Sequence, residues 1–205
     1  MRLSDLHQRL ADLGARPVHR DVIIRAWLQG LPLDTGRRHQ PTDDFLPKSV
    51  RAGLPSLSAD LDALARVRSE HPGADGSSRL LVDIPDGQMV ETVLLPRDGV
   101  CVSSQVGCAV ACRFCMTGKS GLLRQVSSLE IVAQVVQARR RRPVKKVVFM
   151  GMGEPAHNLD NVLEAIDILG TLGGIAHKNL VFSTVGDLRV FERLPELRVK
   201  PALAL

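Results

Sequence analysis

The chain has 205 residues, a formal net charge of +5 and a pI near 9.4. Its apolar content of 44% is enough for a packed core and excludes a disordered tail. The positive charge favours a polyanionic partner, although this indication is weak by itself. Charged side chains recur through the first thirty residues, and no run of eighteen apolar residues occurs, so we expect a soluble, cytoplasmic protein without a membrane segment.

The N-terminal third of the sequence predicts short amphipathic helices that form a small helical accessory domain over residues 1–75. The three candidates are a helix capped by Ser4 and stopped by Gly14, a helix over 21–28 and a helix over 58–69. Residues 72–78 have the composition of a linker, because they are rich in proline, glycine and serine.

After residue 78 the apolar pattern changes from the helical period to that of strands. Two strands over 79–84 and 89–95 flank a tight Pro85-Asp86-Gly87 turn, and a second turn follows at 96–99. The pattern therefore predicts a β-hairpin extension over residues 76–100.

From residue 101 onward, strand and helix patterns alternate along the chain. A capping box formed by Ser127 and Glu130 opens a helix that runs to about residue 140. The later candidates are a strand over 144–150, a helix over 158–169, a strand over 180–183, a helix over 188–194 and a last strand at 201–205. This order predicts a parallel sheet of the α/β class, whose ligands lie at the carboxyl ends of the strands.

Three of the four cysteines form a C-x3-C-x2-C loop, and we call Cys108, Cys112 and Cys115 the cysteine trio. A [4Fe-4S] cluster usually has four cysteine ligands, so three thiolates leave one iron open to a small molecule. The alternatives are a zinc site completed by Cys101, or inert buried thiols. Structural zinc sites tend to use two separated pairs, which favours the cluster. Clustered cysteines without an export signal indicate thiolate ligands in a reducing compartment, not a disulfide framework.

The segments around the cysteine trio resemble the radical S-adenosylmethionine superfamily. CVSSQVGC at 101–108, FCMTG at 114–118 and FMGMGEP at 149–155 are similar, more narrowly, to radical methyltransferases that modify an adenine ring carbon in 23S rRNA and tRNA. The resemblance covers residues 80–205 well. It implies that residues 101–205 are the N-terminal half of a partial (β/α)6 barrel, preceded by the helical domain and the hairpin.

This resemblance also implies two cofactors. The cysteine trio would hold a [4Fe-4S] cluster, and the open iron would chelate the methionine portion of S-adenosylmethionine. Gly153, Glu154 and Ser183 would contact S-adenosylmethionine. From the residues themselves, Gly151 and Gly153 allow close approach of the backbone to a ligand, and the Glu154 carboxylate can accept hydrogen bonds from an ammonium group. A sharp turn is the alternative interpretation of the glycines.

Glu91 and Cys101 are the candidate catalytic residues. Glu91 shares a strand face with Val93 and Leu95 and matches the glutamate that serves the family as general base, although a solvated strand glutamate is the alternative. Cys101 matches the cysteine that breaks a covalent enzyme–RNA link by thiol exchange, which requires a thiolate near a positive or polar environment. A buried structural thiol is the alternative for Cys101. The resemblance also implies a disulfide bond.

The implied activity is methyl transfer to an adenine ring carbon, C2 in preference to C8, of 23S rRNA or tRNA. The family mechanism uses a further cysteine that carries the methyl group, and every cysteine of this chain already has another role. We therefore expect the N-terminal portion of a longer enzyme, or a truncated copy. The implied partners are the RNA and an electron donor such as flavodoxin, with the enzyme as a monomer.

Two other functions remain open at this point. One is a radical S-adenosylmethionine enzyme with a substrate other than RNA, and the other is a noncatalytic metal-binding or RNA-binding remnant. The basic run at 139–142 is either a solvated helix end or a contact to phosphate.

Overall fold

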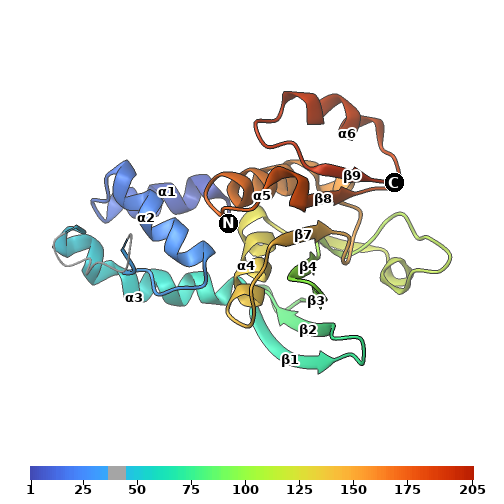
Figure 1. Cartoon of the computed structure of the whole chain (residues 1–205), viewed down its shortest axis with the longest axis horizontal. Helices are drawn as coiled ribbons and strands as arrows, with labels where there is room; N and C mark the ends of the chain where they lie inside the picture. Colours follow the sequence, from blue (N-terminus) through green and yellow to red (C-terminus); the bar gives the residue numbers. More distant parts are fainter. Residues whose placement is uncertain (37–44) are drawn as a thin grey trace.

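The computed structural model describes residues 1–36 and 45–205. Three helices open the chain and lie together on one side of the molecule (Figure 1): α1 (Leu3–Asp12), α2 (Pro17–Leu28) and α3 (Lys48–Ala63). The three predicted helices are present, with different bounds. In α1 the first turn is stabilised by Asp5, whose carboxylate accepts a hydrogen bond of 2.7 Å from the Arg2 N–H, so Ser4 is not the cap.

The prediction that the third helix continues to residue 69 is wrong. Helix α3 ends at Ala63, and strand β1 (Arg66–Pro72) follows and pairs antiparallel with β2 (Ser78–Asp83). The side chains of β1 are exposed or half-buried, so the segment lacks the alternation of apolar residues that identifies a strand. Residues 73–77, predicted as a linker, connect these two strands. The predicted hairpin of β2 and β3 (Met89–Leu95) is confirmed.

The main sheet has seven strands in the order β1-β2-β3-β4-β7-β8-β9. Its remaining strands are β4 (Gly99–Val102), β7 (Lys146–Phe149), β8 (Leu180–Ser183) and β9 (Ala202–Ala204). The ladders from β1 to β4 are antiparallel, whereas those joining β4, β7, β8 and β9 are parallel. The predicted α/β class and parallel sheet are confirmed, and this sheet is compatible with part of a barrel.

Helices α4 (Ser128–Arg139) and α5 (Leu159–Thr171) connect the parallel strands and pack against each other, and α6 (Leu188–Arg193) follows β8 (Figure 1). The predicted capping box of α4 is confirmed, because the Ser127 N–H donates to the Glu130 carboxylate over 2.7 Å. Within residues 1–36 and 45–205, no helix is both long and apolar enough to cross a membrane.

One continuous core joins the N-terminal helices to the sheet. It includes Trp27 of α2, Leu129 of α4, Phe149 of β7 and Phe182 of β8, each at most 1% exposed. Full burial of a side chain such as Leu129 or Phe149 stabilises the fold by roughly 1.5–3 kcal/mol. The division into domains 1–75, 76–100 and 101–205 stays a prediction. All three ranges contribute side chains to this one core.

The basic run at the end of α4 binds several neighbouring elements. The contacts are Arg139 to the carbonyls of Leu28 and Gly173, Arg140 to Asp62, Arg141 to Glu70, and Arg142 to the carbonyls of Gly76 and Leu95. These partners belong to α2, α3, β1, β3 and two loops. The run thus anchors α4 inside the fold, and a simple solvated helix end does not describe it.

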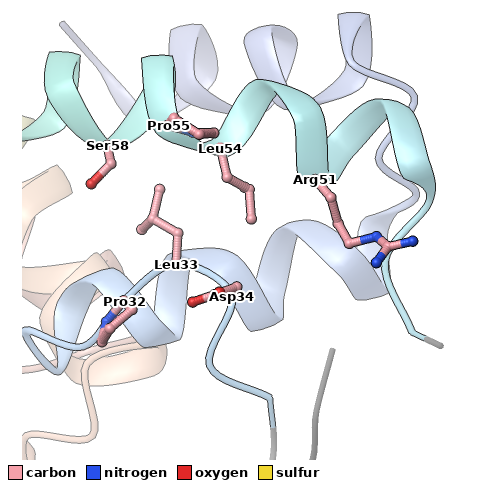
Figure 2. Close-up of a pocket in the computed structure, with 7 residues that line it drawn as sticks. All are labelled: Pro32, Leu33, Asp34, Arg51, Leu54, Pro55 and Ser58. Atoms are coloured by element: carbon pink, nitrogen blue, oxygen red, sulfur yellow. The ribbon is translucent and has the colours of Figure 1, made fainter. Parts of the chain in front are cut away.

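A pocket of about 280 Å³ lies between α3 and the loop that follows α2. Figure 2 shows the side chains of Leu33 and Leu54 facing each other across this pocket, with Pro55 and Ser58 beside them. None of the predicted site residues lines it. The predicted site therefore does not lie in this pocket.

Candidate functional site

The cysteine trio lies in a loop held by its own two-stranded ribbon. Strands β5 (Gln105–Gly107) and β6 (Leu122–Gln125) pair antiparallel at the base of this loop, and Figure 1 shows the loop projecting beyond the main sheet. Gly107 has a φ of +75°, and a Cβ at this position would overlap the Gly121 carbonyl oxygen. The ribbon can therefore close only with glycine at this position.

A pocket of about 240 Å³ brings the cysteine loop together with the loops that follow β7 and β8. All six predicted ligands of the cluster and of S-adenosylmethionine line it: Cys108, Cys112, Cys115, Gly153, Glu154 and Ser183. The pocket lies at the carboxyl ends of the parallel strands, as predicted. Residues separated by up to 75 positions in the sequence thus form one site.

The predicted disulfide bond is not formed, because all four cysteines are free. Cys101 belongs to a strand of the main sheet and does not line the pocket, whereas the cysteine trio does. Within the trio, a hydrogen bond from the Thr117 hydroxyl is the main cause that lowers the pKa of Cys115, with help from backbone N–H groups. A lowered pKa favours the thiolate that a metal ligand requires.

The donor set of this pocket fits a [4Fe-4S] cluster with one open iron. Among the described residues, no three His, Cys, Asp or Glu side chains converge as ligands of a single metal ion. A cubane cluster does not need such convergence, because each of its thiolate ligands binds a different iron. Three thiols and a carboxylate that line the same pocket therefore suit a cluster together with a chelating amino acid.

Glu154 joins the loop after β7 to the loop after β8. The residue is 4% exposed, and its carboxylate accepts one hydrogen bond from the Ala156 N–H, over 2.9 Å, and another from the Val185 N–H, over 3.1 Å. Each carboxylate oxygen keeps a further acceptor position, so the side chain can still accept from an ammonium group in the pocket.

Gly151 and Gly153, in the loop after β7, allow close approach of other parts of the chain as well as of a ligand. A Cβ at Gly151 would lie 2.7 Å from both the Ser103 hydroxyl and the Val102 carbonyl oxygen. A Cβ at Gly153, where φ is +99°, would lie 2.5 Å from the Gln105 side chain. The physical reason for both glycines is thus close packing against the segment after β4, a contact that the sequence pattern did not predict.

Glu91 and Cys101 lie outside this pocket but on one face of the sheet. Cys101 is the register partner of Val93, and residues two apart on a strand share a face, so Glu91 lies on the same side. The Glu91 side chain is 41% exposed, and its carboxylate forms an ion pair of 3.1 Å with Arg79. Burial raises the pKa of Cys101 to about 11, so the group is a protonated thiol at neutral pH, unlike the expected thiolate in a polar environment.

A buried polar network behind the site was not predicted. The Gln134 amide oxygen accepts from the Thr92 hydroxyl (2.8 Å) and the Ser103 N–H (2.9 Å), and its NH2 donates to the Ser103 carbonyl (2.9 Å). The Ser103 hydroxyl donates to the Glu91 carbonyl (2.5 Å) and accepts from the Met152 N–H (2.8 Å). The network thus joins the Glu91 strand to the loop after β7.

The sequence is similar to that of known proteins over the residues that form this site. Residues 102–201 match the family model described as the radical SAM superfamily. A relative from Stutzerimonas stutzeri named "Probable RNA methyltransferase" is 78% identical over the whole chain, which covers 60% of that protein. A relative from Bordetella avium, also named a probable RNA methyltransferase, is 72% identical, and 58% of its length is covered.

The fold is similar to that of a solved structure. The crystal structure of a radical SAM methyltransferase from Sphaerobacter thermophilus matches 99% of this chain with a TM-score of 0.78 and 32% identity, over 61% of its own length. The chain thus spans about 60% of the length of these relatives. Residues 102–201, which contain the cysteine trio and the loops after β7 and β8, are therefore similar in sequence to the radical SAM superfamily.

Proposed function

We propose that the protein is a radical S-adenosylmethionine methyltransferase that methylates an adenine ring carbon of RNA. The single observation that carries this proposal is the shared pocket, where the cysteine trio faces the loops after β7 and β8. The names of the similar proteins, which describe probable RNA methyltransferases, support the substrate class. Because the chain spans about 60% of those proteins, the proposal concerns the full-length protein.

In this proposal the cysteine trio binds a [4Fe-4S] cluster, and Glu154, Gly153 and Ser183 bind S-adenosylmethionine beside it. The chemistry supplied by these bound groups is a one-electron cleavage of the sulfonium. The protein contributes orientation: Glu154 is fixed by two backbone N–H groups and can accept hydrogen bonds from the amino group of the ligand. The Ser183 hydroxyl, at the end of β8, can bind its polar atoms.

Glu91 is proposed as the general base that removes the proton from the methylated adenine carbon. Its side chain is accessible on the open face of the sheet, and its carboxylate forms an exposed ion pair with Arg79. Cys101 lies on the same face and is proposed to release the covalent enzyme–RNA link. Its thiolate would form a disulfide with the methyl-carrying cysteine of the full-length protein, while the carbon–sulfur bond to the RNA breaks and the released carbon takes up a proton. Because this thiol is buried and protonated, its reaction requires a base or a change in its exposure.

The finer assignments rest on the sequence resemblance. They are adenine C2 in preference to C8, 23S rRNA or tRNA as substrate, a methylated cysteine as intermediate, flavodoxin as electron donor, a monomeric state and a cytoplasmic location. The net charge of +5 supports a polyanionic substrate.

The decisive experiment uses the full-length protein reconstituted with iron and sulfide without oxygen. Unmodified 23S rRNA and tRNA transcripts are incubated with it, a reductant and methyl-labelled S-adenosylmethionine, and the nucleosides are analysed by mass spectrometry. We expect labelled 2-methyladenosine, and its loss in Glu91→Gln although S-adenosylmethionine is still cleaved. Absence of any methylated adenine in both RNAs, with an intact cluster, would refute the proposed function.

A further inference from the structure

Two glutamines link the base of the cysteine loop to the S-adenosylmethionine loop. Gln105 is the first residue of β5, the strand that leads into the loop, and Gln125 is the last residue of β6, the strand that leaves it. They are register partners across the ribbon. Any shift of the cysteine loop relative to the main sheet would therefore move both side chains together.

The two side chains form a continuous chain of three hydrogen bonds. The Gln105 amide oxygen accepts from the Glu154 N–H over 2.7 Å, and its NH2 donates to the Gln125 amide oxygen over 2.9 Å. The Gln125 NH2 then donates to the His157 carbonyl over 2.8 Å. The chain thus reaches the residues on either side of Pro155 and Ala156, where the short 310 helix η4 (Pro155–Asn158) begins.

Gln105 also acts as a spacer between the two loops. Its side chain is fully buried and lies against Gly153, where even a Cβ would come within 2.5 Å of it. The orientation of its amide follows from its partners, because the Glu154 N–H can only donate and must face the oxygen. The amide therefore fixes both the distance and the register between the ribbon and residues 153–154.

We propose that Gln105 and Gln125 are positioning residues that hold the loop after β7 at the correct separation from the cysteine trio, and thereby set the affinity for S-adenosylmethionine. This inference rests on the proposed function, because it assumes that the ligand spans the cluster and Glu154. Neither glutamine lines the pocket, so each acts through the backbone of the loop that does.

The loop has a second attachment that does not involve this glutamine pair. Ser103 accepts a hydrogen bond from the Met152 N–H, and the Glu154 carboxylate binds Val185. Removal of the pair should therefore leave the loop folded but displaced or mobile. The expected consequence is weaker ligand binding with an intact cluster, since the cysteine trio is not altered.

The test compares Gln105→Met and Gln125→Met, which keep side-chain length without hydrogen bonds, with the wild-type full-length protein after anaerobic reconstitution. The matched control is Gln8→Met, which removes a hydrogen bond of 2.8 Å to Asp12 on the surface of α1. Iron and sulfide contents are measured first. The dissociation constant of S-adenosylmethionine is then determined from the change it causes in the electron paramagnetic resonance spectrum of the reduced cluster.

We expect wild-type iron content in Gln125→Met and a dissociation constant raised about tenfold, as for loss of one or two hydrogen bonds. Gln105→Met should raise the dissociation constant further. The rise in the double variant should be smaller than the product of the two single rises, because the two side chains share a hydrogen bond. Gln8→Met should change the dissociation constant by less than about twofold. Because Gln125 is exposed, its variant remains informative if Gln105→Met does not fold. Wild-type affinity in Gln125→Met, or loss of its cluster, would overturn the inference. A wild-type protein without a cluster would instead refute the proposed function.

Discussion

The carboxylate of Glu154 accepts a hydrogen bond of 3.1 Å from the backbone N–H of Val185 and thereby joins the loops after β7 and β8. A second N–H, from Ala156, binds the other carboxylate oxygen. One buried charge therefore has a structural role in addition to its proposed contact with the ligand, and this dual role makes its substitution informative.

Glu154→Gln should destabilise the fold and weaken binding of S-adenosylmethionine. The amide places an NH2 group against one of the two N–H donors, so one hydrogen bond is lost and one backbone donor stays buried without a partner. We expect the free energy of unfolding to fall by about 2 kcal/mol, measured by urea denaturation. In the control Glu164→Gln, which removes an exposed pair with Arg2, the loss should stay below about 1 kcal/mol. Equal effects of the two substitutions would contradict this account.

Gly107→Ala should prevent assembly of the cluster. The new Cβ would overlap the backbone of Gly121 and separate the strands of the ribbon that carries the cysteine trio. Gly87→Ala is the matched control, because Gly87 has a similar φ of +80° and open space around its Cβ position. The control should lose only about 1 kcal/mol of stability through backbone strain. Iron content after anaerobic reconstitution measures the difference, and a full cluster in Gly107→Ala would show that the ribbon does not position the loop.

Gln134→Leu should be among the most destabilising substitutions outside the apolar core. It leaves the Thr92 hydroxyl and both backbone groups of Ser103 without their partner. We expect a loss of about 3 kcal/mol or more in the free energy of unfolding, from urea titration. Gln137→Leu, one turn along α4, removes a bond to the Ala65 carbonyl and a longer, exposed bond from Arg141, and should lose about 1 kcal/mol. A loss at Gln134 no greater than at Gln137 would mean that the network contributes little.

The reaction of Cys101 with iodoacetamide should depend steeply on pH. Burial raises its pKa from the ordinary 9.0 to about 11, so at pH 8 the reactive thiolate is roughly a hundredfold scarcer than in an ordinary thiol. The alkylation rate of the folded protein, followed by mass spectrometry of the peptide, should keep rising until about pH 11. In guanidinium chloride the rate should level off near pH 9. A plateau near pH 9 in the folded protein would contradict the assignment.

The sequence was sufficient to predict the parts of the fold that have a strong periodic signal. Helix α4 was predicted from its capping box, and β8 was predicted with its bounds, because a short apolar run lies between turn residues. Strand β1 was missed because its side chains face solvent, and its spacing continued the pattern of the preceding helix. That strand is stabilised by pairing with β2, which a local pattern cannot reveal.

Some residues of the site could also be predicted from the sequence, and others could not. The cysteine trio and the glycine loop have distinctive spacings, so their residues could be named, and the structure brings them into one pocket. The roles of Gln105, Gln125 and Gln134 could not be predicted, although Gln105 lies within the CVSSQVGC segment, because the role of a neutral amide depends on which donors and acceptors the fold places around it. One signal was Gln134, a polar residue inside the apolar stretch of α4 over residues 131–136.

The central claim is that the cysteine trio binds a [4Fe-4S] cluster and leaves one iron open for S-adenosylmethionine. The most direct measurement is electron paramagnetic resonance of the reduced, reconstituted protein with and without S-adenosylmethionine, together with metal analysis. We predict about four irons per chain, a spectrum that changes when the ligand is added, loss of the cluster in Cys108→Ala and its retention in Cys101→Ala. Stoichiometric zinc without a cubane cluster, or a spectrum indifferent to S-adenosylmethionine, would contradict the account.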